Sequence, residues 1–216
     1  MNFDTQSLIL SLKLALVTIL ILIPMGIGCA HQLSRATHSK SILEGLLALP
    51  LVLPPTVLGY YLLIAFSQHG PLPHLAFTFS GLVVASIIFN LPFAIQPIQR
   101  AFESIPKDIK EAAQCCGLNR WQSFKMIELP LAWRGIISAA IMTFAHTLGE
   151  FGVVLMIGGS IPGETKTVAI SIYDSVQHLD NASAGWMSLT LLIISLLAIS
   201  TSYWLAHHKD HSNVGH

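Results

Sequence analysis

Five long apolar stretches, separated by shorter polar segments, dominate the chain. A transmembrane helix needs roughly 17–25 mostly apolar residues, and each of the five stretches is long enough. They cover residues 8–30, 43–66, 81–98, 133 to about 157, and 186–206. The pattern predicts an all-α polytopic membrane protein with five spans, in which residues 1–216 form a single transmembrane domain.

Residues 168–179 follow a different pattern. Apolar side chains recur at helical spacing at Val168, Ile172, Val176 and Leu179, with polar residues between them. This predicts a short amphipathic helix with those four side chains on one face, which either packs on the bundle or lines its outer mouth. A sixth span at this position is the alternative topology.

Composition supports the membrane assignment. Hydrophobic residues make up 53% of the chain and charged residues only 10%, with a mean hydropathy of +0.65. A soluble domain carries about 25% charged residues. The net charge of zero gives no reason to expect a nucleic-acid partner. The three cysteines, Cys29, Cys115 and Cys116, have neither the number nor the spacing of a disulfide framework, a redox motif or a zinc site.

The basic residues are distributed unequally between the two sides of the membrane. Nine of the eleven fall on one side, namely Arg35, Lys40, Arg100, Lys107, Lys110, Arg120, Lys125, Arg134 and Lys209. By the positive-inside rule this side is the cytoplasm. We therefore expect the N-terminus outside and the C-terminus inside. Because residues 1–7 contain no basic residue, we interpret the first stretch as a retained helix and not as a signal peptide.

Prolines interrupt the first three stretches. In lipid, the carbonyl groups that proline leaves unpaired need protein or water as partners, so such helices are typical of bundles that line a cavity. Pro54, Pro55 and Thr56 stand near the middle of the second stretch and are candidates for lining a pathway, although a packing kink is the alternative. Thr143 and Thr147 are further candidates, as is Ser138, although each hydroxyl can instead bond to its own helix backbone.

Glu150 is the acidic residue inside the fourth apolar stretch. An intramembrane carboxylate is by default a functional candidate, so Glu150 joins the possible pathway residues, and a proton relay is one such role. We favour a structural role, with the carboxylate hydrogen-bonded at a helix break between Gly149 and Gly152.

A polar insert, residues 104–130, separates the third and fourth stretches. Pro106 suits the first turn of a helix, and Gly117 suits a left-handed helix end. Asn119 and Gln122 have the spacing of a capping box, so a second short helix should begin there and end at Pro130. Two short helices that meet at Gly117 are too polar to enter lipid and offer a docking surface.

The order of residues in this insert resembles a family signature. Residues 111–130 read EAAQCCGLNRWQSFKMIELP, in which Glu-Ala-Ala, Gly117 and Ile-x-Leu-Pro have the spacing of the EAA loop of ABC-importer permeases. By this resemblance, residues 104–130 are a cytoplasmic coupling segment that docks on an ATPase. The resemblance and the apolar anchors together indicate the coupling residues Glu111, Ala112, Ala113, Gly117, Trp121, Phe124, Ile127, Leu129 and Pro130.

Two further stretches resemble molybdate permease subunits. They read LPLVLPPTVLGYYLL from residue 49 and HTLGEFGVVLMIGGSIPGETKTVAISIYD from residue 146. The resemblance implies a type I ABC importer permease in the inner membrane that carries molybdate. Sulfate, thiosulfate or tungstate are the alternative substrates. The chain departs from many of these subunits at His146-Thr147 and at Ser160.

The family implies several partners. They are a second copy of the permease, an ABC ATPase subunit in the cytoplasm and a periplasmic oxyanion-binding protein, with lipid around the spans. The chain lacks the Gly-x-x-x-x-Gly-Lys-Ser/Thr phosphate loop, so ATP hydrolysis is expected in the partner. We expect no cofactor and no metal site. A secondary transporter or channel would leave the coupling segment unexplained. An intramembrane enzyme built on His146 and Glu150 would lack the HExxH and GxSxG motifs.

Overall fold

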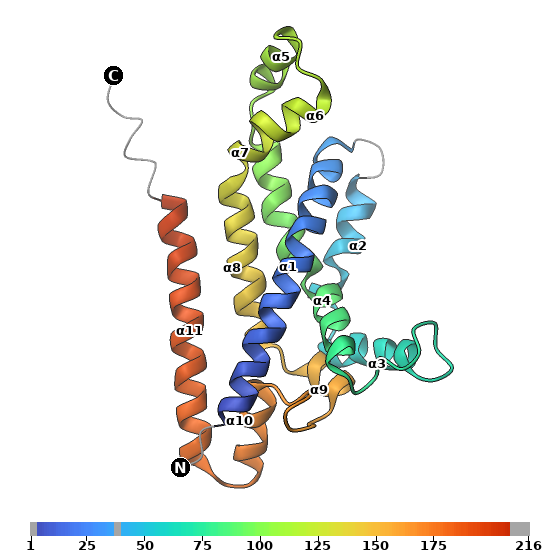
Figure 1. Cartoon of the computed structure of the whole chain (residues 1–216), viewed down its shortest axis with the longest axis vertical. Coiled ribbons are helices and arrows are strands. Elements are labelled where there is room, and N and C mark those ends of the chain that lie inside the picture. Colours follow the sequence, from blue (N-terminus) through green and yellow to red (C-terminus); the bar gives the residue numbers. More distant parts are fainter. Residues whose placement is uncertain (1–3, 37–39, 208–216) are drawn as a thin grey trace.

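The computed structural model describes residues 4–36 and 40–207, and all regular elements in this part of the chain are helices (Figure 1). Three of them are long and apolar enough to cross a membrane without a break. These are α1 (Thr5–Arg35), α4 (Phe79–Glu103) and α11 (Asn181–His207). Lys209, which the charge pattern assigns to the cytoplasm, lies outside the described residues. The predicted all-α membrane fold is confirmed.

The second apolar stretch is not one straight span. It forms α2 (Lys40–Val52) and α3 (Pro55–Phe66), whose axes meet at 102°. Pro54 has an extended backbone, with φ −54° and ψ 134°. Proline disfavours the α conformation in the residue before it, so Pro55 makes the helix stop at Pro54. Single prolines have no such effect elsewhere, since Pro24, Pro50, Pro92 and Pro97 all lie inside helices.

The fourth stretch is also broken. It forms α8 (Trp133–Gly149) and α9 (Gly152–Gly158), with Glu150 and Phe151 between them. The expected break between Gly149 and Gly152 is therefore confirmed. At its other end, α8 meets the segment Arg120–Leu131 at 64°. If each bent pair of helices counts as one span, the described residues contain up to five spans.

The central helix of the bundle is α4. It packs along α1 and α8, and its inner face supplies both main core clusters. One cluster surrounds Leu82 and Phe89 and includes side chains of α9, and the other surrounds Ile95 and Phe102 near the end of α4. Close approach is possible because small residues face each other, as where Gly26 of α1 packs against Ala94.

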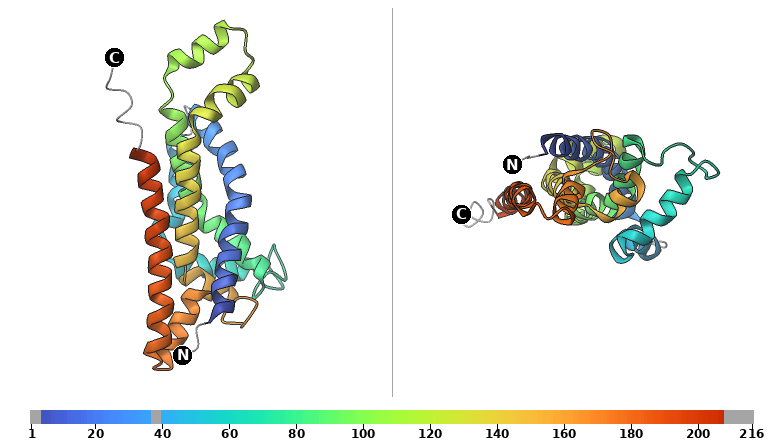
Figure 2. Two further views of the ribbon diagram at one scale, coloured as in Figure 1. Left: turned by 60° about the vertical axis from the view of Figure 1, so that its left-hand side comes forward. Right: turned by 90° about the horizontal axis from the view of Figure 1, so that it is seen from below.

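The peripheral part of the fold is formed by α10 (Val168–Gln177) and α11. Figure 2 shows α11 at the edge of the bundle, where it packs against α8 and α10. With ten residues, α10 is too short for a sixth span. The predicted short helix is present, but it ends at Gln177 and its apolar face is covered only in part, because Val176 is 49% exposed and Leu179 is 84% exposed. Only the first turns are covered, and there Val168, Ile170 and Ser171 are buried against other elements.

Polar contacts fix α10 to the start of α1. The Val168 backbone N–H donates to Ser11 Oγ at 2.8 Å, and the Ser171 hydroxyl donates to Asp4 Oδ2 at 2.8 Å. Burial by itself would raise the pKa of the Asp4 carboxyl. Hydrogen bonds from Ser7 and Ser171 and the charge of Lys166 outweigh burial, so the pKa of Asp4 is below its usual value.

Candidate functional site

The coupling segment projects from one end of the bundle (Figures 1 and 2). It contains α5 (Lys107–Cys115), α6 (Arg120–Ser123), the π-helix η1 (Phe124–Glu128) and α7 (Leu129–Leu131). The start of α1 lies at the opposite end of the bundle from this segment (Figure 1). The N-terminal end of α1 and the coupling segment therefore lie on opposite sides of any membrane that the long helices cross.

Local sequence signals determine the shape of this segment. Pro106 lies immediately before α5 and Asp108 is in its first turn. After α5, Gly117 adopts a φ of +78°, and a side chain there would meet no atom within 4 Å. Asn119 and Gln122 form the predicted capping box at the start of α6. The predicted turn at Gly117 and the start of the second helix are confirmed.

The end of the second helix differs from the prediction. Pro130 does not stop the helix, which continues through η1 and α7 to Leu131. Proline has no N–H to donate to the carbonyl four residues earlier, and a π-turn accommodates this loss by wider hydrogen bonds. In this turn the Leu129 N–H bonds to the carbonyl of Phe124, five residues earlier. The chain then bends at Ala132 into α8.

The predicted coupling residues differ in exposure. Glu111 and Ala112 are exposed, whereas Ala113 is only 4% exposed. Trp121 is 69% exposed, and its ring centroid lies 5.5 Å from that of Phe124. Phe124, in contrast, packs against the rings of His31 and Phe102. Of the three remaining predicted residues near the end of the segment, Ile127 and Leu129 are half-buried and Pro130 is exposed.

A buried carboxylate joins the coupling segment to α1. Glu128 is 1% exposed, and its Oε1 accepts a 2.6 Å hydrogen bond from Arg35 Nη2. The Ser123 hydroxyl donates to the same oxygen at 3.3 Å, and His31 Nε2 lies 3.3 Å from Oε2. Glu128 was not among the predicted site residues. Its place in the apolar run Met-Ile-Glu-Leu-Pro-Leu is the signal that could have identified it.

A second candidate region is the contact between the two helix breaks. A Cβ on Gly152, just after the α8–α9 break, would lie 2.7 Å from Pro55 Cβ, just after the α2–α3 break. One turn along α3, a Cβ on Gly59 would lie 2.8 Å from Met156 Cβ of α9. The two glycines therefore allow α3 and α9 to approach closely. Pro54, Pro55 and Thr56 remain exposed beside this contact.

The other pathway candidates are buried within the chain. Glu150 Oε1 accepts a 3.0 Å hydrogen bond from the Val153 N–H, so the carboxylate caps the first turn of α9. The Thr147 hydroxyl donates to the Thr143 carbonyl at 2.7 Å. Ser138 lies 3.4 Å from Ser202 of α11, and the His146 ring nitrogen Nδ1 lies 3.0 Å from Asn90 Oδ1. Of these groups, Ser138 and His146 contact other helices, whereas the Thr147 bond lies within α8 and Glu150 caps α9.

Comparison with known proteins agrees with this geometry. Residues 22–212 match the family model described as the inner membrane component of binding-protein-dependent transport systems. The chain belongs to this family. It is therefore a multi-pass inner-membrane transport component, which argues against the two alternatives of a secondary transporter and an intramembrane enzyme.

Relatives in the family differ in their named substrates. The chain is 44% identical over 210 residues to the molybdenum transport system permease protein ModB of Azotobacter vinelandii, covering 93% of each protein. It is 36% identical to ModB of Escherichia coli strain K12, covering 94% of this chain and 93% of that one. A sulfate transport system permease protein of the same strain, CysT, is 29% identical and is covered over 67% of its length.

Solved structures show that the family fold is shared. One is a bacterial alginate ABC transporter in complex with an alginate pentasaccharide-bound periplasmic protein, with a TM-score of 0.74 at 16% identity. The match covers 100% of this chain and 82% of that one. Another is the MetNI methionine ABC transporter in inward-facing conformations, with a TM-score of 0.69 at 15% identity, covering 94% of this chain and 96% of that one. The predicted type I ABC importer permease fold is confirmed.

Proposed function

We propose that this chain is the membrane-spanning subunit of an ATP-driven importer of molybdate. The observation that carries the proposal is the 44% identity to a molybdenum permease over 93% of both chains. Its Gly117 turn and capping box give the coupling segment a defined shape at one end of the bundle. Sulfate or thiosulfate is the second candidate, supported by the more distant CysT relative, and tungstate remains the close chemical analogue of molybdate.

In this proposal the coupling segment docks on a separate ATPase subunit in the cytoplasm. Glu111 and Ala112 would approach the ATPase closely, and the exposed Trp121 ring would insert into it. The excess of basic residues at this end supports a cytoplasmic location, with the N-terminus outside. ATP hydrolysis belongs to the partner, and the permease converts the movement of its coupling segment into a change of access.

Two copies of the chain would enclose the pathway between them. Pro54, Pro55 and Thr56 are exposed on one chain, and a second copy facing them would enclose an aqueous path. Such a path is needed because even one charge at the bilayer centre costs several kcal/mol, and an oxyanion such as molybdate carries two. A periplasmic binding protein would supply selective binding, so that the pathway itself can bind weakly and release its anion.

The test is uptake of labelled molybdate and labelled sulfate by cells in which the gene is deleted and then restored. We expect deletion to abolish molybdate uptake at low external concentration, and restoration to recover it. Loss of sulfate uptake alone would assign the chain to sulfate. Uptake in vesicles that contain the permease without any ATPase would overturn the ATP-driven assignment.

A further inference from the structure

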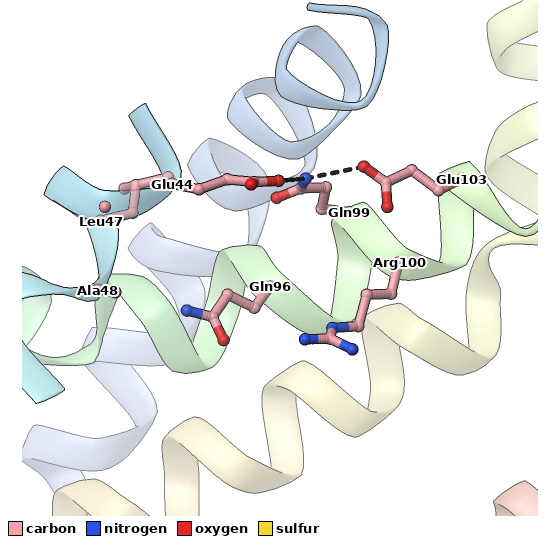
Figure 3. Close-up of a pocket in the computed structure, with 8 residues that line it drawn as sticks. Glu44, Leu47, Ala48, Gln96, Gln99, Arg100 and Glu103 are labelled. Atoms are coloured by element: carbon pink, nitrogen blue, oxygen red, sulfur yellow. Dashed lines mark hydrogen bonds between the residues drawn. The ribbon is translucent and has the colours of Figure 1, made fainter. Parts of the chain in front are cut away.

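A polar pocket of about 410 Å³ lies between α2 and α4, in the half of the bundle nearer the coupling segment (Figure 3). Its residues lie in the middle of α2 and in the last eight positions of α4, which is the end that leads into the coupling segment. The lining residues are Glu44, Gly45, Leu47, Ala48, Gln96, Gln99, Arg100 and Glu103.

The two carboxylates of the pocket are already engaged. Gln99 is 4% exposed, and its Nε2 donates to Glu44 Oε1 at 2.6 Å and to Glu103 Oε1 at 2.8 Å (Figure 3). Lys40 Nζ donates to the same Glu103 oxygen at 2.7 Å and lies 4.0 Å from Glu44. Gln99 is neutral, so the single charge of Lys40 balances only one of the two carboxylates and this side of the pocket stays negative.

The cation of the pocket is not engaged in this way. The Arg100 side chain is exposed and makes no hydrogen bond or salt bridge to another described residue, although its charge interacts favourably with the Glu103 carboxylate. Gln96 precedes it by one helical turn, and Figure 3 shows both side chains extending from α4 on the side away from Gln99 and Glu103. A guanidinium presents a planar set of donors that matches the oxygens of a tetrahedral oxyanion. The Gln96 amide adds two N–H donors beside it.

The pocket adjoins the candidate pathway. The helix α2 that supplies Glu44 to Ala48 runs directly to the break at Pro54 and Pro55. An anion leaving that break toward the coupling end would pass along α2 and reach Arg100. We propose that Arg100 and Gln96 form a weak site for a tetrahedral oxyanion at the cytoplasmic end of the pathway. The proposal rests on the function proposed above and adds the residues of its exit side.

The charges around the pocket suit a site that binds an anion weakly and then releases it. The guanidinium is exposed, so salt screens its charge and the attraction is small. Glu44 and Glu103 stand on the other side of the pocket, so an anion is attracted by Arg100 and repelled by nearby carboxylates. Both effects favour release into the cytoplasm. The same chemistry would recognise the phosphate of a lipid headgroup, and the experiment below distinguishes the two sources.

The experiment measures protection of a thiol placed in the pocket. Ala48→Cys is introduced after the exposed residues Cys29, Cys115 and Cys116 have been changed to Ser. The complete transporter, with its ATPase and binding protein, is labelled with N-ethylmaleimide in the presence of molybdate, sulfate or chloride. Molybdate at about twice its dissociation constant should slow labelling about threefold. The unoccupied fraction of the site falls by a factor of one plus the ratio of the molybdate concentration to its dissociation constant.

Protection should depend on the proposed residues. Adding Arg100→Gln should abolish protection by molybdate, Gln96→Leu should weaken it, and Arg100→Lys should retain part of it. Arg134→Gln, which removes an arginine of α8 outside this pocket, should leave protection unchanged and is the matched control. In uptake assays, Arg100→Gln should slow transport severalfold while the ATPase still co-purifies with the permease.

Three results would overturn the proposal. The first is a lack of protection in a transporter that takes up molybdate normally. The second is equal protection with and without Arg100. The third is protection by dihexanoyl phosphatidylglycerol but not by molybdate or sulfate, which would assign Arg100 to lipid. Failure of the unmutated complex to take up either oxyanion would instead overturn the proposed function itself.

Discussion

Arg35 at the end of α1 and Glu128 in the coupling segment form a hydrogen-bonded ion pair with a 2.6 Å separation between Nη2 and Oε1. The carboxylate is almost fully buried, and His31 and Ser123 flank it. A buried carboxylate that loses its partner is destabilising, so the pair holds the coupling segment in one position against α1. Residues 93 positions apart in the sequence are thus joined at the proposed docking surface.

The first prediction concerns this pair. Glu128→Gln and Arg35→Gln should each lower the thermal unfolding midpoint of the detergent-solubilised permease and weaken its stimulation of ATP hydrolysis. Because the two groups act together, a double-mutant cycle should give a coupling free energy of about 1–3 kcal/mol. Strictly additive effects of the two substitutions would show that the pair does not hold the segment.

A second prediction separates docking from folding. Trp121→Ala should leave the unfolding midpoint nearly unchanged, because the ring is mostly exposed. It should weaken binding of the ATPase by about 2 kcal/mol or more, as expected for an aromatic anchor at an interface. Phe124→Ala is the matched comparison. Its ring packs against His31 and Phe102, so its loss should lower the unfolding midpoint itself.

Calorimetry of the purified permease and co-purification of the ATPase measure these two effects separately. If Trp121→Ala permease retained the ATPase as well as the unchanged chain does, the ring would not be an anchor.

The third prediction concerns the contact between the helix breaks. Gly59→Ala places a Cβ 2.8 Å from Met156 Cβ, so α3 and α9 must separate. We expect a loss of about 1–3 kcal/mol in stability, typical of overpacking, together with slower uptake. Gly28→Ala in α1 is the control, because a Cβ there meets no atom within 4 Å. It should stabilise the helix by up to about 1 kcal/mol. Equal effects of the two alanines would contradict the close contact.

The fourth prediction is a dependence on pH at the outer end. The pKa of Asp4 is lower in the folded chain than its ordinary value of 3.8. The carboxylate therefore stabilises the fold above that ordinary value, and the contribution is lost as the pH falls through the lower pKa of the folded state. Hydrogen exchange of the α10 amides should accelerate on acidification below about pH 4, beyond the intrinsic effect of pH on exchange. Asp4→Asn should remove this extra acceleration and leave α10 more exchangeable at neutral pH.

The sequence predicts those parts of the fold that depend on neighbouring residues. Span positions follow from apolar length, and the Gly117 turn and the Asn119–Gln122 box follow from local backbone chemistry. The break at Glu150 also follows from the glycines around it. The 102° bend at Pro54 and Pro55 was anticipated only as a kink, because its size depends on packing of α3 against α9.

Contacts between segments that are distant in the chain could not be predicted from the sequence. The partners of Glu128 lie on α1, and nothing near residue 128 indicates them. The π-turn before Pro130 requires knowledge of how the helix continues into α8. The covered face of α10 depends on Asp4 and Ser11, which precede it by more than 150 residues. The roles of Thr56, Thr143 and Thr147 in a pathway stay predictions.

The attachment of α1 at both of its ends has a mechanical consequence. Arg35 ties one end to the coupling segment, and Asp4 and Ser11 tie the other to α10. The helix that carries these ties, Thr5–Arg35, has 31 residues and is about 46 Å long at 1.5 Å per residue. A helix resists compression along its axis, so a displacement of the coupling segment along that direction should be passed through α1 to α10. A single chain segment thereby links the two ends of the bundle mechanically.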